Sequence, residues 1–322
     1  MKLPEIPDAI RELADRRAAA RRAHDWATAD GIKAELEGLG WRVADAASLY
    51  TLERAVAPDV EEEGIVRYGA VASVPSRLDE PASGTATIVL VADDADESGA
   101  VARAAAAHLA VSPGTAVVVV ANGVVPAAAP TLAGAIDGVE VVWLASRQGR
   151  AAALNAGIRR AAAPIVILVD AGLEVTGDLA GSLAAALDDP TVAVAGPFGL
   201  ASADLRRFDP AAPDASDVVA IDGAAIAFRR ADFVARGPLD EHFYRPASLD
   251  TWWSLVLRDQ AEADPDDAPP RRAVQAGTGL VRRPDRGSAG APDDERTARL
   301  AKKAFYRVLK RFATRYDLLV GD

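Results

Sequence analysis

The stretch RQGRAAALNAGIRRAAAPIVILVDAGLEV, residues 147–175, decides the fold of this chain. Small residues dominate 150–163 and predict a helix, and Pro164 separates them from the wholly apolar run IVILV at 165–169. Such a short apolar run is typical of a strand buried on both faces of a parallel sheet. Asp170 follows this strand directly. It therefore stands at the carboxyl end of a parallel strand, where open α/β sheets bind their ligands.

Strands and helices alternate on both sides of this stretch. The predicted strands are 86–92, 115–121, 139–144 and 191–196, and the predicted helices are 97–110 and 179–189. Apolar strands that alternate with helices form parallel sheets with right-handed crossovers. We therefore predict an α/β fold with a doubly wound, mostly parallel sheet flanked by helices.

The chain after residue 200 has a less regular pattern. Strand character is strongest at 218–230, and helical patterns follow at 231–237, 249–259 and 292–316. The last of these helices has one apolar side, formed by Leu300, Phe305, Val308, Leu309 and Phe312. We assign residues 85–322 to one α/β domain with halves at 85–200 and 201–322.

The first 45 residues have a different composition and predict a small helical hairpin. The second of its helices has one apolar face, formed by Trp26, Ala29, Ile32, Leu36 and Leu39. The first helix carries a basic cluster, formed by Arg16, Arg17, Arg21 and Arg22. Residues 46–84 combine a charge run with a Pro- and Ser-containing stretch, which predicts a connector.

Composition excludes several classes of protein. The 322 residues carry a formal net charge of -11, which argues against a globally basic nucleic-acid binder. The sequence has no cysteine and only three histidines, so neither disulfides nor a typical zinc site is expected. No apolar signal segment opens it, and its longest apolar runs, such as 116–121, are too short to span a bilayer. We expect a cytoplasmic protein.

Four segments together resemble the family-2 glycosyltransferases, which have the GT-A fold. They are the opening stretch at 147–175, VVVVANG at 117–123, GPLDEHF at 237–243, and the basic tail from 280 to 312. The resemblance implies an inverting transfer of a sugar from a nucleotide-diphosphate donor to a hydroxyl acceptor. It makes 85–200 the nucleotide-binding half and 201–322 the acceptor half. A glycan or polyprenyl-linked acceptor in cell-envelope synthesis is the expected partner.

The resemblance makes Asp170 the metal ligand of the donor site. In the family a D-x-D pair of carboxylates holds a divalent metal beside the donor diphosphate, whereas this chain reads Asp170-Ala171-Gly172. One carboxylate with phosphate oxygens can still hold Mg²⁺ or Mn²⁺, because Mg²⁺ takes few protein ligands and keeps several waters. The alternative is that Asp170 caps the turn that follows it.

Further donor contacts are implied around the first two strands and the helix before Asp170. Arg147 is expected to meet phosphate charge, Gly149 and Gly157 to allow close approach of the backbone, and Asn155 to bond ribose or phosphate. Asn122 is also assigned to the nucleotide. The family's base-contacting Asp is replaced by Ala121, for which Asp93 and Asp94 are candidate substitutes.

Asp250 is the implied general base. It occupies the position of the family's acidic residue at the start of the helix after G-x-x-D-E-x-F, and one carboxylate suffices to take the acceptor's proton. The alternative is that Asp250 is the N-cap of the 251–259 helix. Asp240 and Glu241 are expected to brace the motif. One of Trp252 and Trp253 is expected in the core, and the other is a candidate for stacking on a sugar or base.

The basic tail has two interpretations. Arg282, Arg283 and Arg286 stand where the family has a His-containing segment, and they either close over the donor diphosphate or form a solvated loop. The helix at 302–315 is basic and either contacts anionic lipid or is an ordinary solvated face.

Two alternatives concern the whole chain. Because acidic motif positions are lost, the protein is alternatively a degenerate module that binds a nucleotide or glycan without turnover. Residues 1–45 are similar to the helical module at the C-terminus of cysteinyl-tRNA synthetases. That resemblance leaves open an RNA contact, although packing or self-association of the hairpin is the simpler interpretation.

Overall fold

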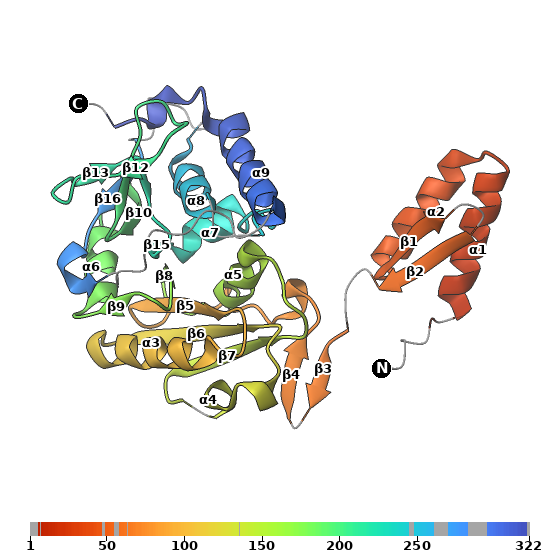
Figure 1. Ribbon diagram of the computed structural model, residues 1–322, viewed down its shortest axis with the longest axis horizontal. Coiled ribbons are helices and arrows are strands. Elements are labelled where there is room, and N and C mark those ends of the chain that lie inside the picture. The colour runs from red at the N-terminus through yellow and green to blue at the C-terminus, as the bar shows by residue number, and fades with distance from the viewer. Residues whose placement is uncertain are drawn as a thin grey trace. The chain divides into compact units, whose positions relative to one another are not determined.

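The computed structural model describes residues 6, 8–46, 49–54, 58–62, 64–134, 136–244, 248–260, 270–282 and 295–320. The chain forms two compact units, Met1–Asp59 and Val60–Asp322 (Figure 1). This boundary differs from the predicted divisions at 45 and 84. The reason is that residues 46–84, predicted as a connector, contribute strands to both units.

The first unit packs two helices on a two-stranded hairpin. Its elements are α1 (Asp8–Arg22), α2 (Trp26–Gly38), β1 (Trp41–Ala46) and β2 (Leu49–Arg54), and the two strands pair antiparallel. Arg17 is 3% exposed and binds Asp45 through two hydrogen bonds of 2.7 and 3.0 Å, which joins α1 to β1. One member of the basic cluster is therefore structural.

The apolar face predicted for α2 is buried only at its centre. Ala29, Ile32 and Leu36 are at most 5% exposed, whereas Trp26 and Leu39 are 52% and 53% exposed. Trp26 is the first residue of α2 and Leu39 is its C-cap, so both lie at the ends of the helix, outside its buried centre.

The second unit is built on one large sheet. In the described part of the chain this sheet has ten strands in the order β13-β16-β10-β15-β8-β5-β6-β7-β4-β3. Their bounds are β3 (Val60–Glu62), β4 (Ile65–Tyr68), β5 (Ala86–Ala92), β6 (Thr115–Asn122), β7 (Val139–Leu144), β8 (Ile165–Val169), β10 (Val192–Gly196), β13 (Asp217–Val218), β15 (Ala225–Arg229) and β16 (Arg272–Gln275). The central strands β8, β5, β6, β7 and β4 are parallel, and β15 is antiparallel between β8 and β10.

Helices cover both faces of this sheet, as predicted (Figure 1). They are α3 (Ser98–Val111), α4 (Pro130–Ala133), α5 (Arg150–Ile158), α6 (Leu179–Ala186), α7 (Arg230–Arg236), α8 (Leu249–Arg258) and α9 (Glu295–Phe312). Successive side chains of a strand point to opposite faces. Along β5, Val89 and Val91 therefore enter the core beneath α5, and Ile88 and Leu90 enter the core of α3 and α6.

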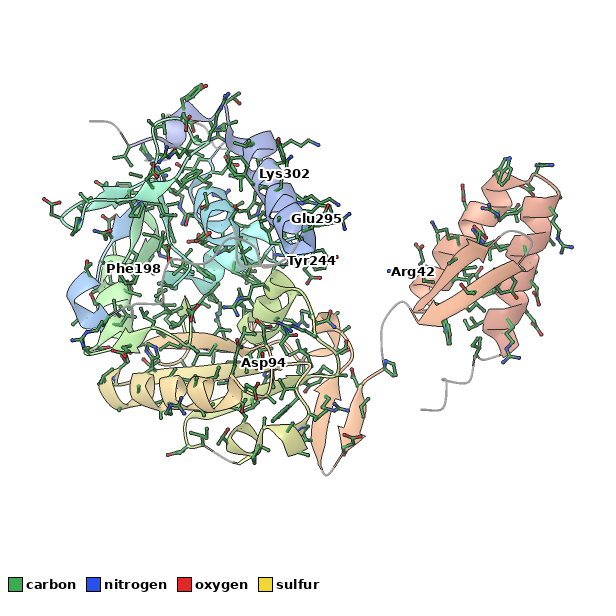
Figure 2. All side chains as sticks on the ribbon, in the orientation of Figure 1. Arg42, Asp94, Phe198, Tyr244, Glu295 and Lys302 are labelled. Carbon is green, nitrogen blue, oxygen red and sulfur yellow. The ribbon has the colours of Figure 1, made fainter. Side chains whose placement is uncertain are left out.

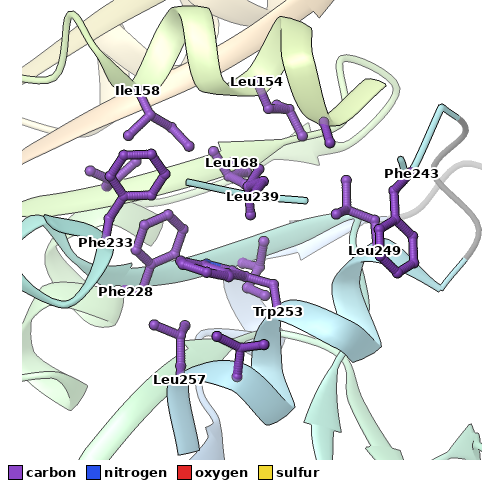
Figure 3. Packing of buried hydrophobic residues seen from close by; sticks show 14 of the residues in the cluster. Leu154, Ile158, Leu168, Phe228, Phe233, Leu239, Phe243, Leu249, Trp253 and Leu257 are labelled. Carbon is purple, nitrogen blue, oxygen red and sulfur yellow. The ribbon is translucent and has the colours of Figure 1, made fainter. Parts of the chain in front are cut away.

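An aromatic cluster joins the two halves of the large unit (Figure 3). Leu154 and Ile158 of α5 face Phe228, Phe233 and Trp253 there. The ring of Trp253 lies edge-on to Phe228 and Phe233, with centroid distances of 5.4 and 6.0 Å. Trp253 is thus the core member of the tryptophan pair.

Shorter elements position the loops at the carboxyl ends of the strands. Strands β9 (Glu174–Val175) and β17 (Val281–Arg282) pair antiparallel, and β11 (Gly199–Ala201), β12 (Asp209–Pro210) and β14 (Ala220–Ile221) form a small separate sheet. The 3-10 turns are Val71–Ser73, Pro126–Ala128, Thr278–Leu280 and Tyr316–Leu318. Helix α5 ends at Ile158 rather than at the predicted residue 163. Pro164 disfavours helical geometry at Ala163, and the helix already ends at its C-cap, Arg159.

Candidate active site

Asp170 lies at the carboxyl end of β8 and is exposed. Its backbone N–H donates to the carbonyl oxygen of Ala224 at 2.9 Å, and its Oδ1 accepts the N–H of Gly172 at 2.7 Å. The predicted turn-capping bond is therefore present. The carboxylate is nevertheless exposed at the carboxyl edge of the sheet. The structure therefore permits both a turn-capping role and a metal-binding role for Asp170.

The turn at residues 222–224, between β14 and β15, holds a second carboxylate. Gly223 donates its backbone N–H to Asp250 Oδ2 at 2.8 Å, and the N–H of Thr251 reaches Asp250 Oδ1 at 2.8 Å. Asp222 stabilises the turn, because its Oδ1 accepts the N–H of Ala224 at 2.9 Å. Since the Ala224 carbonyl also accepts the backbone N–H of Asp170, one short turn contacts both aspartates assigned from the sequence.

The environment of Asp250 changes its acidity. The residue is half-buried, and removal of its carboxyl from water raises the pKa of Asp250 to about 6. The negative charge of Asp222 acts in the same direction. The backbone N–H groups of Thr251 and Gly223 oppose this rise in pKa. The result is a carboxyl group that exchanges its proton close to neutral pH, which is where a general base works best.

The alternative role of Asp250 as N-cap is wrong. The N-cap of α8 is Ser248, which has a φ of 63° and whose side chain makes no capping bond. Asp250 is already inside the first helical turn, where Trp252 N–H bonds the Ser248 carbonyl at 3.0 Å. Its carboxylate instead reaches across to the 222–224 turn.

Asn122 does not face a ligand. It is 1% exposed, and its side chain donates to Asp93 Oδ1 at 2.6 Å and to the Gln148 carbonyl at 3.1 Å, and accepts the Gln148 N–H at 2.7 Å. These bonds tie the ends of β5 and β6 to the loop before α5. Asp93, one of the two predicted substitutes, is more exposed than Asn122, and a guanidinium nitrogen of Arg150 lies 3.9 Å from its Oδ2.

Arg147 is exposed beside the end of β6. A Cβ at Gly123 would stand 2.4 Å from the backbone nitrogen of Arg147, and Gly123 has a φ of +76°. Only glycine allows this strand end to pass so close to residue 147. The arrangement leaves Arg147 available to an anionic ligand at the carboxyl edge of the sheet.

Asn155 is buried at 2% exposure and serves the fold. Its side-chain amide donates to the Leu239 carbonyl at 2.9 Å and accepts the Leu239 N–H at 3.0 Å. It also reaches Glu241 Oε1 at 3.2 Å. The expected contact of Asn155 with ribose or phosphate is therefore replaced by a clamp on the 237–243 motif.

The two glycines of α5 also serve packing. A Cβ at Gly157 would stand 2.4 Å from Val89 Cγ1 and 2.9 Å from Val120 Cγ2, so this glycine seats the helix on the sheet. A Cβ at Gly149 would meet the Tyr244 ring at 2.8 Å.

The amino end of α5 is closed by protein rather than open to a ligand. Its first N–H groups, from Arg150 and Ala151, donate to the carbonyls of Tyr244 and Phe243 at 3.0 and 3.1 Å. The helix therefore has little capacity left to receive phosphate.

The G-x-x-D-E-x-F motif is braced as expected. Asp240 pairs with His242 at 2.7 Å and with Arg307 of α9 at 3.0 Å. Trp252, the candidate for stacking on a ligand, instead packs against Phe243 and Phe312 with centroid distances of 5.5 and 5.4 Å. Tyr244 is the exposed aromatic at this corner, at 56% exposure.

The basic tail reaches the loop of Asp170. Arg282 of β17 pairs in register with Glu174 of β9, and Thr176 N–H bonds the Leu280 carbonyl at 2.8 Å. Arg282 is exposed on this strand. Arg283 and Arg286 lie outside the described residues.

The donor set fits a metal that takes most of its ligands from the substrate. Within the described ranges, no group of three or more His, Cys, Asp or Glu side chains is arranged to hold a metal ion. A single exposed carboxylate at a strand end, Asp170, matches Mg²⁺ or Mn²⁺ bound through one carboxylate, phosphate oxygens and waters.

Comparison with known proteins agrees with the resemblance seen in the motifs. Residues 97–216 match the family model described as Glycosyl transferase family 2. The structure of GalNAc-T7 with UDP, GalNAc and Mn²⁺ is similar in fold, with a TM-score of 0.53 and 14% identity over 81% of this chain and 52% of that chain. The mannosyltransferase PcManGT from Pyrobaculum calidifontis, solved with GDP-Man and Mn²⁺, gives a TM-score of 0.42 and 19% identity over 63% of this chain and 56% of that one.

A shorter similarity connects the chain to another protein class. It is 41% identical over 51 residues to the Cysteine--tRNA ligase of Opitutus terrae, which is 16% of this chain and 11% of that protein. The chain thus spans about half the length of the two solved structures and a small part of the ligase. Among the helices described, none combines the length and the apolar character needed to cross a bilayer.

Proposed function

We propose that this protein is an inverting glycosyltransferase that uses a nucleotide-diphosphate sugar, because residues 97–216 match the model of family-2 glycosyltransferases. The observation that carries the proposal is the pair of carboxylates joined by the 222–224 turn. Asp170 is exposed at the strand end, and Asp250 is half-buried with a pKa raised to about 6. Two carboxyl groups in such different environments suit two different tasks.

Asp170 serves the donor in this proposal. With a bound Mg²⁺ or Mn²⁺, it holds the donor diphosphate, and the metal would neutralise charge on the leaving group. Arg147 and Arg282 are exposed at the same edge of the sheet and add positive charge for the phosphates. Because Asn122, Asn155 and the amino end of α5 are occupied by protein contacts, we place the donor over Asp93, Arg147 and Asp170.

Asp250 serves the acceptor. Its carboxylate takes the proton of the acceptor hydroxyl while that oxygen bonds to the anomeric carbon and the bond to the diphosphate breaks. Attack from the face opposite the leaving group inverts the anomeric configuration. With a pKa of about 6, Asp250 is largely ionised at neutral pH yet more basic than an ordinary aspartate.

We place the reaction in cell-envelope glycan synthesis, with a glycan or polyprenyl-linked acceptor. A cytoplasmic protein that contacts the inner face of the membrane is part of the same proposal. The basic character of α9 supports an enzyme that works with an acceptor held at an anionic surface.

The test is donor turnover. Purified protein is incubated with UDP-, GDP- and dTDP-sugars and Mn²⁺ or Mg²⁺, and release of nucleoside diphosphate is measured. Asp250→Asn is expected to lose turnover by ~100-fold or more, the usual contribution of a general base. The matched control is Asp79→Asn, which changes an exposed aspartate and is expected to keep full turnover. Equal turnover of the two variants would contradict the assigned base.

A binding module without turnover is the second candidate. It is favoured by the loss of the second carboxylate of the D-x-D pair, where this chain has Gly172, and by the closed amino end of α5. Calorimetry that detects a bound nucleotide sugar, in a preparation that never releases nucleoside diphosphate, would support this candidate over the enzyme.

An RNA contact through the first unit is a third candidate, favoured by one exposed aromatic. Trp26 is 52% exposed, and the guanidinium of Arg21 lies 5.4 Å from its ring centroid, an arrangement on which a base can stack. The similarity to a Cysteine--tRNA ligase adds support. A gel shift of the full chain with tRNA, lost in Trp26→Ala, would establish it, and no shift at physiological salt would end it.

A further inference from the structure

Helix α9 carries two classes of cation. Arg307 and Arg311 face the domain and pair with Asp240 and Asp259, each at 3.0 Å. On the same side the apolar residues Ala304, Val308 and Phe312 are 5%, 1% and 0% exposed. This face is therefore fully used to hold the helix on the domain.

The outer face of α9 is formed by Arg299, Lys302, Lys303, Tyr306 and Lys310. At 3.6 residues per turn these residues lie within about a third of the helix circumference, along about 16 Å of its length, and opposite the buried side. All of them are exposed, and Tyr306 is 55% exposed. Lys302 projects outward from the helix in Figure 2.

The cations of this outer face have no acidic partner among the residues that the structure describes. One of these cations contacts another residue of the same face: the ammonium of Lys302 lies 6.0 Å from the ring centroid of Tyr306. Glu295, at the first turn, is the sole acidic residue in the α9 sequence. Four unpaired cations on one face stand out in a protein of net charge -11.

The geometry points to the outer face of α9 as a docking surface for an anionic lipid bilayer. A flat anionic surface can meet the cations of this face, while Asp240 and Asp259 next to the helix are paired with Arg307 and Arg311 on its inner side. The attraction acts over a Debye length of roughly 10 Å. A dissolved polyanion that wraps the protein would meet the acidic surface as well. Tyr306, between Lys302 and Lys310 on the helix, suits the boundary between head groups and water, where tyrosine is enriched.

Docking there would orient the acceptor side of the domain. Helix α8, which carries Asp250, packs on α9 through Trp252, whose ring centroid lies 5.4 Å from that of Phe312 and 5.3 Å from the guanidinium of Arg311. A lipid-linked acceptor would therefore approach from the side of the molecule that contains α8. The docking itself does not depend on sugar transfer, so it can be tested without a known substrate.

The experiment is co-sedimentation of the full chain with phosphatidylcholine vesicles that contain or lack phosphatidylglycerol. Binding is expected only to the anionic vesicles, with release as salt is raised. Lys302→Gln combined with Lys310→Gln is expected to lower partitioning by roughly tenfold or more, since each basic residue near such a surface adds substantial attraction. The control, Arg103→Gln with Arg236→Gln, removes two exposed cations from α3 and α7 and is expected to bind like the unmodified protein.

Three results would overturn the proposal. One is equal binding of the Lys302/Lys310 variant and the control variant. Another is binding that does not distinguish anionic from zwitterionic vesicles. The third is loss of binding on Arg16→Gln with Arg22→Gln, which would assign membrane contact to the first unit. Circular dichroism of each variant checks that α9 is still folded.

Discussion

At the scale of single residues, two aspartates that contact the same turn have different environments. The Asp170 carboxylate accepts the N–H of Gly172 and is exposed, whereas the Asp250 carboxylate is half-buried and accepts the N–H groups of Gly223 and Thr251. The two aspartates therefore lie in two different environments, and burial raises the pKa of Asp250. This difference separates a metal- and phosphate-binding role from a proton-accepting role.

Asp222→Asn is expected to lower the pKa of Asp250. Asparagine keeps the Oδ1 that accepts the Ala224 N–H, so the turn is retained, but the negative charge that raises the pKa of Asp250 is lost. If transfer is observed, the acid limb of its rate against pH should move from near pH 6 to lower pH. A carbon-13 titration of labelled aspartate, assigned with Asp250→Asn, measures the same shift without any activity.

Asp222→Ala provides the contrasting variant, because it removes the charge together with the bond to Ala224. A loss of turnover in Asp222→Ala with retention in Asp222→Asn would fit a positioning role. An unchanged titration of Asp250 in Asp222→Asn would show that the two carboxylates are not coupled.

At the scale of elements, α5 is the helix whose role differs most from expectation. Its residues from Ala151 to Ile158 are all buried, so a polar residue in this stretch has to be satisfied internally. Asn155 meets that need through Leu239, and Gly157 lets the helix approach Val89 and Val120. The helix thereby positions the 237–243 motif.

Gly157→Ala is expected to destabilise the large unit by about 1–3 kcal/mol, the usual effect of overpacking. The new methyl group would meet Val89 and Val120 at distances that no real Cβ tolerates. Gly31→Ala in α2 is the matched control. Nothing lies within 4 Å of its Cβ position, so removal of a helical glycine should stabilise the first unit by up to about 1 kcal/mol. Urea unfolding measures both, and equal effects of the same sign would contradict the assignment of Gly157 to packing.

Most regular elements of the large unit could be predicted from the sequence. Strands β5, β7 and β8 have the predicted bounds, because continuous apolar runs between turn residues leave few alternatives. The strand pair at residues 60–68 lies in the stretch that the sequence predicts as a connector. These strands are short and half-exposed, and β4 is held by its pairing with β7, a contact distant in sequence.

The candidate site was less predictable. Asp170 could be singled out because it follows an apolar strand directly, whereas Asp250 was singled out only through the family resemblance. Asn122 and Asn155 were misassigned, because an asparagine that satisfies buried backbone and one that binds a ligand look alike in a sequence. The one signal that could have separated them was the absence of polar residues around Asn155. Asp222 was missed because its partner, Asp250, is 28 residues away.

At the scale of the whole molecule, two titratable groups, the buried His108 and the half-buried Asp250, act on stability in opposite directions. His108 is 0% exposed, and burial lowers its pKa from 6.5 to about 4. Burial raises the pKa of Asp250 from 3.8 to about 6. Between these pH values the unfolded chain binds the extra proton at His108, so that stability rises with pH, whereas the folded chain binds it at Asp250, so that stability falls with pH.

His108→Leu is therefore expected to change the slope of stability against pH. The neutral, buried histidine adds about 3 kcal/mol to the free energy of unfolding as pH rises from 4 to 6.5, and the substitution removes this contribution. What remains is the opposite contribution of Asp250, up to about 3 kcal/mol, so the variant should lose stability as pH rises over the same range. Unfolding in urea at a series of pH values measures it.

The contrasting variant is Asp250→Asn, whose stability should rise more steeply with pH than that of the unmodified protein. If the free energy of unfolding depended on pH in the same way in the unmodified protein and in both variants, the pKa values of His108 and Asp250 would not be shifted as the structure indicates.

The most direct test of the central claim is a crystal structure with a nucleotide sugar and Mn²⁺. We expect the metal to be bound by the carboxylate of Asp170, with the diphosphate of the donor beside it. We also expect Asp250 to lie on the far side of the anomeric carbon from the leaving group. A donor bound away from the carboxyl end of β8, or a metal held without Asp170, would contradict the central claim.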